Sequence, residues 1–504
     1  MKHVTMPPCP TMKAILIHLL TPLLLALAGL HAASAPSPAG KPNILLFLAD
    51  NWSWPHAGVL GDPTAKTPVF DRMAREGVLF HQAFCPVPSC SPTRSSILTG
   101  RAAHQLEDAA SLWSAFPSKL KVFTDALRAA GYEVGFSGKG WSPGNYKDYG
   151  WTENPVGKQF KDFAEFIAQH DPAKPFFFWS GNTDTSLNKW RYDPDGWAGL
   201  DPASVKVPPE LPDSPTVRTN LLAYYGAVGR VDADAGRCVA ELEKLHLLDE
   251  TLVVYTSDNG WQMPRGLANC YDTGTRVPLA IRWGSKLQAG RQVDDFINLT
   301  DLAPTFLQAA GLTPSADMTG RSFLDLLLGQ PSAIARDHVF LERERHANVR
   351  RGGLSYPIRG IRTKDFLYLW NMRPDRWPAG DPKAYFAVGD YGDVDGSHAK
   401  AFILANLGQP EMKKFFDLSF DKRPGEELFD LRTDPHQLTN VANRSEYDAT
   451  RQELRGRVER WMRETADPRV DPTYDAWDKY PYFGGAMVDK DGKPLPKGKS
   501  RTKQ

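Results

Sequence analysis

The stretch NILLFLAD, Asn43 to Asp50, decides the fold of this chain. Its apolar residues form a short continuous run, which is typical of a strand buried on both faces of a parallel sheet. An acidic residue, Asp50, stands directly at the end of the run. The same arrangement recurs in EVGFS before Lys139, PFFFWS before Asp184 and TLVVYT before Asp258. The sequence therefore predicts a set of buried strands, each followed by a polar residue.

Segments with helical periodicity separate these predicted strands. They span Thr67 to Glu76, Val122 to Ala130 and a longer apolar stripe from Leu222 to Leu242. Strands that alternate with helices predict an α/β fold, with a large, mostly parallel sheet sandwiched by helices. In such sheets ligands bind beyond the carboxyl ends of the strands. We therefore expect the four polar residues that follow the strands to converge there.

The character of the sequence changes beyond about Arg350. The run Ile358 to Trp370 predicts a β-hairpin, and Glu446 to Thr465 has the pattern of an amphipathic helix. We expect a catalytic domain over residues 42–345 and a smaller C-terminal α+β subdomain over residues 346–485. The Lys-rich end, residues 486–504, has no apolar periodicity, so we expect a disordered basic tail.

The N-terminal segment, residues 1–35, has the features of a signal peptide. Lys13 precedes an apolar stretch from Ala14 to Leu30, and the small residues Ala33 to Ala35 resemble a cleavage site. The stretch has no strong stop-transfer charge beside it, so we expect no stable membrane anchor. The protein is expected to be exported, to the periplasm or the medium.

Composition and charge exclude some functions. The chain of 504 residues has a formal net charge of +1, so no global field attracts nucleic acid, and we expect no nucleic-acid partner. Beyond the signal peptide the chain keeps Cys85, Cys90, Cys238 and Cys270. Four cysteines in so long a chain allow at most one or two disulfides and exclude a disulfide scaffold.

The segment CSPTRSSILTGR, Cys90 to Arg101, is the strongest functional motif. A buried cysteine at the start of a helix would explain Pro92 and Leu98, but it would not explain Arg94 together with Gly100. The complete motif resembles the signature of the type I sulfatases, formylglycine-dependent enzymes of the alkaline-phosphatase-like superfamily. The resemblance implies that Cys90 is matured to 3-oxoalanine (formylglycine). The implied partner is a formylglycine-generating or an anaerobic sulfatase-maturating enzyme.

Other segments extend this resemblance from Pro42 to about Ala442. PNILLFLADN and VVYTSDNG look like the metal segments of the family, and LRAAGYEVGFSGKG looks like its lysine segment. The resemblance implies that one Ca²⁺ is held by the modified Cys90 with Asp50, Asn51, Asp258 and Asn259. Oxygen ligands suit such a hard cation. The family usually has Asp-Asp at the first pair, so Asn51 predicts weaker metal binding.

The resemblance also implies the chemistry. One hydroxyl of the hydrated aldehyde attacks sulfur, an alcohol or amine leaves, and the second hydroxyl drives the release of sulfate. Arg94 would stabilise the hydrated aldehyde, and Lys139 would contact the sulfate oxygens. The expected substrate is a sulfated carbohydrate.

Three positions depart from the family pattern. Trp141 and Ser186 stand where relatives often have His, and Leu267 stands where they have Lys. The first interpretation is a bacterial subgroup resembling the heparan N-sulfatases, acting on an N-sulfoglucosamine or heparan-type substrate with other contacts. The candidates for substrate binding are Asp184, His346, Arg345 and His104. A structural role for His104, or an inter-domain ion pair for His346, stays open.

Two further interpretations also stay open. The first is a degenerate sulfatase that binds glycans as a pseudoenzyme, because three usual functional positions are changed. The second is a phosphoester hydrolase with Ser91 or Thr93 as nucleophile, although the sequence lacks the additional His and Asp cluster of a second metal. Six tryptophans near the motifs could stack on sugar rings, although core packing is favoured for any single one: Trp52, Trp54, Trp141, Trp179, Trp190 and Trp261.

Overall fold

The computed structural model describes residues 1, 3, 40–191, 193, 195–383 and 389–484. The predicted basic tail and, apart from residues 1 and 3, the predicted signal peptide lie outside these ranges. The chain divides into two units, residues 1–36 and 37–504, and all that follows concerns the second. In the described part of the chain, no helix is long and apolar enough to cross a membrane.

The large sheet has eight strands in the order β10-β2-β9-β8-β1-β7-β4-β6. All neighbours run parallel except those that involve β9, which is antiparallel to β2 and β8. The prediction of a mostly parallel sheet is therefore confirmed. The strands are β1 (Asn43–Ala49), β2 (Val78–Phe84), β4 (Glu133–Gly138), β6 (Lys158–Phe160), β7 (Phe176–Asn182), β8 (Thr251–Ser257), β9 (Leu279–Arg282) and β10 (Arg291–Asn298).

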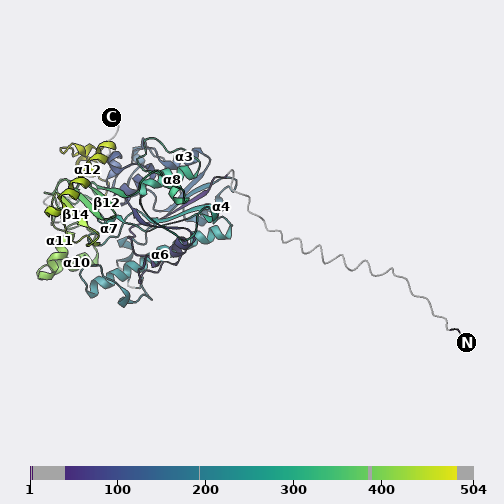
Figure 1. The fold of residues 1–504 in the computed structure, drawn as a ribbon, viewed down its shortest axis with the longest axis horizontal. Helices are drawn as coiled ribbons and strands as arrows, with labels where there is room; N and C mark the ends of the chain where they lie inside the picture. Colours follow the sequence, from purple (N-terminus) through teal and green to yellow (C-terminus); the bar gives the residue numbers. More distant parts are fainter. Residues whose placement is uncertain (2, 4–39, 192, 194, 384–388, 485–504) are drawn as a thin grey trace. The chain divides into compact units, whose positions relative to one another are not determined.

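The central strand β1 shows why the sheet is covered on both faces. Ile44, Leu46 and Leu48 pack into one hydrophobic cluster, and the alternate residues Leu45 and Phe47 pack into another. The first cluster includes α2 (Cys90–Thr99), α3 (Phe123–Ala129) and α8 (Leu302–Ala309), and the second includes α1 (Pro68–Glu76), α4 (Phe163–Gln169) and α6 (Pro215–Lys244). Figure 1 shows α3 and α8 on one side of the sheet and α6 on the other.

Local sequence determines where α6 begins and where α2 ends. The Ser214 side chain accepts a hydrogen bond from the backbone N–H of Val217, and Pro215 occupies the first turn of α6. Gly100 ends α2 with φ of 65°, a left-handed conformation that favours glycine. This accounts for Gly100 in the motif as a helix terminator.

The C-terminal part of the chain forms a four-stranded antiparallel sheet in the order β11-β12-β13-β14. Its apolar face packs on α12 through Leu454, Val458 and Met462, so the predicted hairpin and amphipathic helix are confirmed. The bounds are β11 (His338–Arg343), β12 (Ile358–Thr363), β13 (Phe366–Asn371), β14 (Glu426–Asp430) and α12 (Asp448–Glu464). The remaining elements are β3 (Ser114–Ala115), β5 (Gly144–Asn145), α5 (Leu187–Trp190), α7 (Asp272–Thr275), α9 (Leu324–Leu327), α10 (His398–Ala405) and α11 (Lys413–Ser419). The boundary between residues 345 and 346 stays a prediction.

Candidate active site

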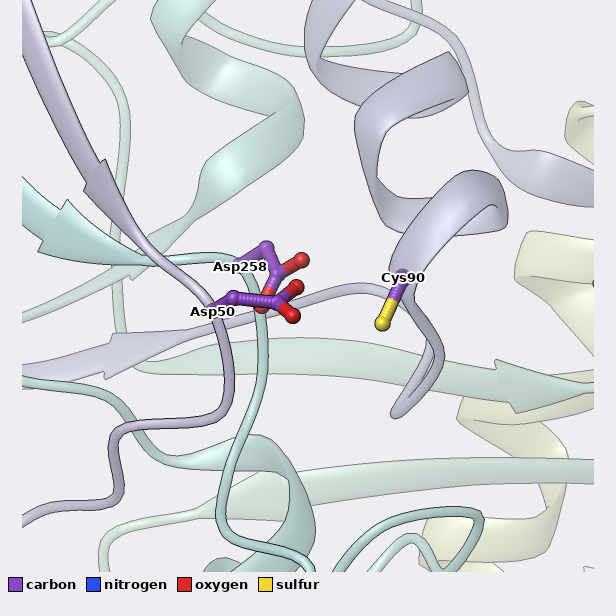
Figure 2. Close-up of side chains that lie close together, drawn as sticks. All are labelled: Asp50, Cys90 and Asp258. Carbon is purple, nitrogen blue, oxygen red and sulfur yellow. The ribbon is translucent and has the colours of Figure 1, made fainter. Parts of the chain in front are cut away.

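The site lies where four neighbouring parallel strands, β8, β1, β7 and β4, end. Asp258 follows β8, Asp50 follows β1 and Lys139 follows β4. The N-terminus of α2 delivers Cys90 to the same place, as Figure 2 shows. One potential ligand atom from each of Asp50, Cys90 and Asp258 lies within 4.8 Å of the others. The convergence predicted for three of the strand ends is thus present.

Arg94 links the two carboxylates from beneath. It stands four residues after Cys90 on α2, so both side chains lie on one face of the helix. Its Nε donates to Asp258 Oδ2 at 2.9 Å, its Nη2 to Asp50 Oδ1 at 3.3 Å and its Nη1 to the Lys139 carbonyl oxygen at 2.7 Å. The Arg94 side chain is fully buried. Arg94 therefore holds the two carboxylates and the end of β4 together.

Lys139 supplies the second positive charge, since its Nζ lies 2.5 Å from Asp50 Oδ1. Burial raises the pKa of Asp50, but the charges of Lys139 and Arg94 outweigh burial and hold that pKa well below its usual range. Burial and the adjacent Asp50 raise the pKa of Asp258 to about 7. A cation between the carboxylates would stabilise the ionised form of Asp258, so cation binding and ionisation reinforce each other.

Asn51 and Asn259 add two amide oxygens to the potential metal ligands. Asn259 Nδ2 donates to Asn51 Oδ1 at 2.7 Å, and Asn51 Oδ1 lies 3.9 Å from Cys90 Sγ. Asn259 Oδ1 is buried and has no hydrogen-bond partner among the described residues. A buried oxygen without a donor is suited to a cation, and carboxylate and amide oxygens are the ligands that Ca²⁺ prefers. The residues present therefore fit a hard divalent cation.

A cavity of about 500 Å³ opens above this cluster. Of the predicted site residues, it brings together Asp50, Asn51, Cys90, Lys139 and His346. The wall of the cavity also includes Trp113, Ser186, Leu187, Lys189, Arg191, Gln262, Leu267 and Asp395. Arg94, Asp258 and Asn259 are fully buried beneath the floor of the cavity.

Three predicted substrate contacts, Asp184, His104 and Arg345, do not line this cavity. The backbone N–H of Asp184 donates to Asn182 Oδ1 at 2.7 Å, and this turn places Asp184 on the wall of a different cavity. His104 is buried, with its two ring nitrogens bonded to Glu342 and Thr465. Arg345 Nη2 donates to the carbonyl oxygens of Tyr480 and Pro481. The structure thus gives His104 and Arg345 partners that tie segments of the chain together.

His346 does reach the cavity, and its Nδ1 lies 2.8 Å from the Ser89 hydroxyl. Burial, together with the charges of Arg343 and Arg350, lowers the pKa of His346 to about 4, although the charge of Asp393 acts in the opposite direction. The imidazole is therefore neutral near pH 7. It is suited to hydrogen bonding with a substrate and poorly suited to delivering a proton as imidazolium.

Trp141, Ser186 and Leu267, the three positions that depart from the family pattern, bring no side chain that could protonate a leaving group. Trp141 is fully buried, and its Nε1 donates to Ser95 Oγ at 2.8 Å. The Ser186 hydroxyl donates to Asp50 Oδ2, and Leu267 lines the cavity as an apolar wall. The floor of the site is therefore assembled, but these positions supply no acid.

The sequence did not reveal three wall residues, Trp113, Gln262 and Asp395. Trp113 is 37% exposed. Among the six tryptophans expected near the site, all but Trp54 are fully buried, and Trp54 stacks on Arg276 at 3.5 Å. Core packing therefore accounts for the predicted group. Trp113 lies in a loop without periodicity, so no sequence pattern distinguished it.

A family model described as Sulfatase matches residues 42–197 and 145–312, more than half of the chain. The chain belongs to the sulfatase family. It is thus a sulfatase enzyme, as the Cys90 motif predicted. A second model, described as N-sulphoglucosamine sulphohydrolase, C-terminal, matches residues 265–383.

Individual similar proteins agree with the assignment of the chain to the sulfatase family. N-sulphoglucosamine sulphohydrolase of Homo sapiens is 28% identical over 489 residues, covering 85% of this chain and 91% of that protein. A structure solved in complex with its substrate D-glucosamine-2-N,6-O-disulfate has a TM-score of 0.58 at 19% identity, covering 86% of this chain and 99% of that one. A phosphonate monoester hydrolase of Agrobacterium radiobacter has a TM-score of 0.59 at 17% identity, covering 84% and 96%. The fold alone therefore does not separate sulfate from phosphonate chemistry.

Proposed function

We propose that this sulfatase releases sulfate from a sulfated carbohydrate of the N-sulfoglucosamine or heparan type. Cys90 would be matured to formylglycine, and Asp50, Asn51, Asp258 and Asn259 would hold one Ca²⁺. The observation that carries the proposal is the meeting of Cys90, Asp50 and Lys139 on the floor of one cavity, with Asp258 beside Asp50 and Cys90, beneath that floor. Sulfate transfer requires a nucleophile, a cation and a positive charge near the sulfate oxygens. Three strand ends and one helix bring residues suited to these tasks together.

The state of the Cys90 thiol supports its maturation. Burial and the charge of Asp50 raise the pKa of this thiol well above its usual range. A protonated thiol is a weak nucleophile, so the unmodified residue is poorly suited to attack sulfur. A hydrated aldehyde at this position would supply an oxygen nucleophile instead. The proposed partner is a formylglycine-generating or anaerobic sulfatase-maturating enzyme, and the signal peptide would export the protein.

The two positively charged side chains of the site, Arg94 and Lys139, would have different tasks. Arg94 is fully buried, and the carboxylates and carbonyl oxygens beside it already accept its hydrogen bonds, so it would act by positioning them. Lys139 lines the cavity, so its ammonium group would contact sulfate oxygens. The guanidinium group of Arg94 can bond several acceptors at once, whereas the compact ammonium group of Lys139 suits contact with an anion.

The outer half of the cavity would bind the sugar. Lys189 and Arg191 line the wall and would attract the other anionic groups of a sulfated saccharide. Trp113 offers an exposed aromatic face for a pyranose ring. His346 and Asp395 reach the cavity from the C-terminal part, so the proposed subdomain, residues 346–485, would complete the substrate site. The named substrates of the relatives above support a glucosamine unit.

Removing the aromatic face of Trp113 should weaken substrate binding. We expect Trp113→Ala to raise KM for a sulfated saccharide roughly 3- to 10-fold, because an aromatic contact contributes about 0.5–1.5 kcal/mol. The kcat should change little, since Trp113 is remote from the sulfur in this account. Steady-state kinetics with Trp113→Phe as the matched control would measure this. An unchanged KM in Trp113→Ala would contradict the stacking role.

Calcium should raise the thermal stability of the protein. A ligand that binds only the folded state stabilises it by about 2.7 kcal/mol at a hundredfold excess over Kd, which predicts a rise of a few degrees in Tm. The measurement is thermal unfolding with Ca²⁺ against EDTA. Asp258→Asn should lose the shift, and Asp417→Asn, which removes an exposed carboxylate on α11, should keep it. A shift of equal size in Asp258→Asn would place the ion elsewhere.

The direct test of function is sulfate release from a panel of sulfated saccharides. Protein co-expressed with a maturating enzyme should release sulfate, and protein made without one should not. Binding without release by the matured protein would favour the glycan-binding pseudoenzyme. Faster cleavage of phosphoesters than of sulfates would favour the phosphoester hydrolase.

A further inference from the structure

We infer that Asp395, held by Gln262, donates the proton to the leaving group when the sulfate ester is cleaved. The inference rests on the proposed function and assigns a task that the three unusual positions leave unfilled. Asp395 and Gln262 line the same cavity as Cys90 and Lys139. They come from distant parts of the chain, the loop after β8 and the segment before α10.

The orientation of the Gln262 amide is fixed by its surroundings. Gln262 Oε1 accepts from the backbone N–H of Leu187 at 2.6 Å and from Asn51 Nδ2 at 3.1 Å. Because the backbone N–H of Leu187 is a donor, the atom that faces it must be the amide oxygen. The Nε2 group therefore faces Asp395 and donates to its Oδ2 at 2.7 Å.

This bond leaves one oxygen of Asp395 to carry a proton. Among the described residues, no side chain or backbone group donates to Oδ1 of Asp395. A carboxyl group whose first oxygen accepts from a fixed amide is held in position, while its second oxygen keeps its proton for transfer. Gln262 also contacts Asn51, one of the proposed metal ligands. The Asp395 carboxyl group is therefore connected to these ligands through Gln262 alone.

The other acidic groups of the cavity are committed elsewhere. In the described part of the chain, Asp50 and Asp395 are the carboxyl groups that line this cavity. Asp50 already binds Lys139, Arg94 and Ser186. His346 is neutral near pH 7, for the reasons given above. Lys139 keeps its charge beside Asp50 and faces the sulfate in the proposed function.

The surroundings of Asp395 act on the pKa of its carboxyl group in both directions. Burial raises the pKa of its carboxyl group above the ordinary value, and the charge of Asp393 acts in the same direction. The Gln262 hydrogen bond, Lys400 and Arg191 lower this pKa without cancelling the effect of burial. The acid form is lost as pH rises through the raised pKa, so kcat for a poor leaving group should fall on that alkaline side.

The transfer balances as follows in atoms and charge. The hydroxyl oxygen at position 90 forms a new bond to sulfur and gives up its proton to water, and the bond from sulfur to the sugar oxygen or nitrogen breaks. The electron pair of the broken bond stays on the leaving atom, which takes the proton from Oδ1 of Asp395. Asp395 becomes a carboxylate and regains its proton from water before the next turnover.

The test compares a poor and a good leaving group. Asp395→Asn should lower kcat for a sulfated saccharide by about 10²-fold or more, because general acid catalysis contributes 10²- to 10⁴-fold. The same variant should change kcat for 4-nitrophenyl sulfate less than about threefold, since a nitrophenolate leaves without a proton. The alkaline limb of the saccharide pH profile should disappear. Asp390→Asn, an exposed carboxylate in the same segment, is the matched control.

Other outcomes separate the inference from the proposed function. An equal loss on both substrates, or no loss on either, would overturn the role of Asp395 while the wild-type enzyme stays active. No release by the matured wild-type protein from either substrate would overturn the proposed function and the inference with it. Gln262→Ala frees Asp395 without removing it, so it should show a smaller loss with the same selectivity. If Asp395→Asn fails to fold, this second variant decides, and equal effects on both substrates would overturn the role.

Discussion

Replacing Cys90 with alanine is expected to lower kcat for sulfate release by at least about 10⁴-fold. Removing a nucleophile from an assembled site typically costs several orders of magnitude, because the remaining groups stabilise a transition state that no longer forms. Cys90 is the residue that the α2 N-terminus places against Asp50 and Asp258. Ion chromatography of released sulfate under saturating substrate measures the effect.

The control for this variant is a second buried thiol. Cys238→Ala on α6 removes a thiol whose Sγ lies 3.8 Å from the Ser180 hydroxyl, away from the cavity of the site. It should keep kcat within a few-fold of the wild-type value. If Cys90→Ala and Cys238→Ala released sulfate at equal rates, Cys90 could not be the nucleophile.

Replacing Arg94 with alanine is expected to lower the free energy of unfolding by about 3–5 kcal/mol, the usual cost of leaving a buried charge without its partner. Arg94 is fully buried and bonds to both Asp50 and Asp258. The variant should also lose sulfatase activity, since the two carboxylates lose their common anchor. Unfolding by denaturant in EDTA measures the stability without a contribution from bound cation.

Two further variants make the Arg94 prediction specific. Arg101→Ala removes a partly exposed arginine just beyond the same helix and should cost less than about 1 kcal/mol. Asp258→Asn in the Arg94→Ala background should recover part of the lost stability, because it removes one unpaired charge. If the double variant lost the sum of the free energies lost by Arg94→Ala and by Asp258→Asn, the proposed coupling between Arg94 and Asp258 would be wrong.

The fold could be predicted largely because burial leaves a direct signature in sequence. The run Asn43 to Ala49 is apolar on both faces, and the structure gives β1 the same bounds. The stripe from Leu222 to Leu242 likewise lies within α6. The antiparallel strand β9 and the order of the strands leave no such signature, since pairing between distant segments is set by tertiary packing.

The floor of the site was predictable for a related reason. Parallel strands end at a common edge, so Asp50, Lys139 and Asp258 meet there once the strands are known. Asp184 shares the pattern but not the outcome, because the bond from its N–H to Asn182 turns the chain away. A local turn of this kind is not visible in a strand pattern.

Two residues of the cavity wall, Trp113 and Asp395, were not predictable, although His346 was. Asp395 lies in a segment rich in Pro, Gly and Asp, where no periodicity marks one carboxylate among several. Its position depends on the packing of the C-terminal part against the loop of Gln262, and Trp113 likewise depends on the packing of a loop. The substrate contacts that we propose for Trp113 and Asp395 therefore depend on residues that only the three-dimensional structure brings together.

The phosphoester interpretation finds little support in the geometry. Ser91 and Thr93 are fully buried, and the Thr93 hydroxyl donates to the Val87 carbonyl oxygen. Neither residue lines the cavity. Among the described residues, one cluster of potential metal ligands is present, Asp50, Cys90 and Asp258, without the additional His and Asp cluster that a phosphatase of that type usually brings.

The central claim is that Cys90 is matured to an aldehyde. Mass spectrometry of the peptide that contains Cys90, from protein co-expressed with a maturating enzyme, tests it most directly. We expect the mass of formylglycine at position 90, with unmodified thiols at Cys85, Cys238 and Cys270. Finding only the unmodified thiol at Cys90 would contradict it.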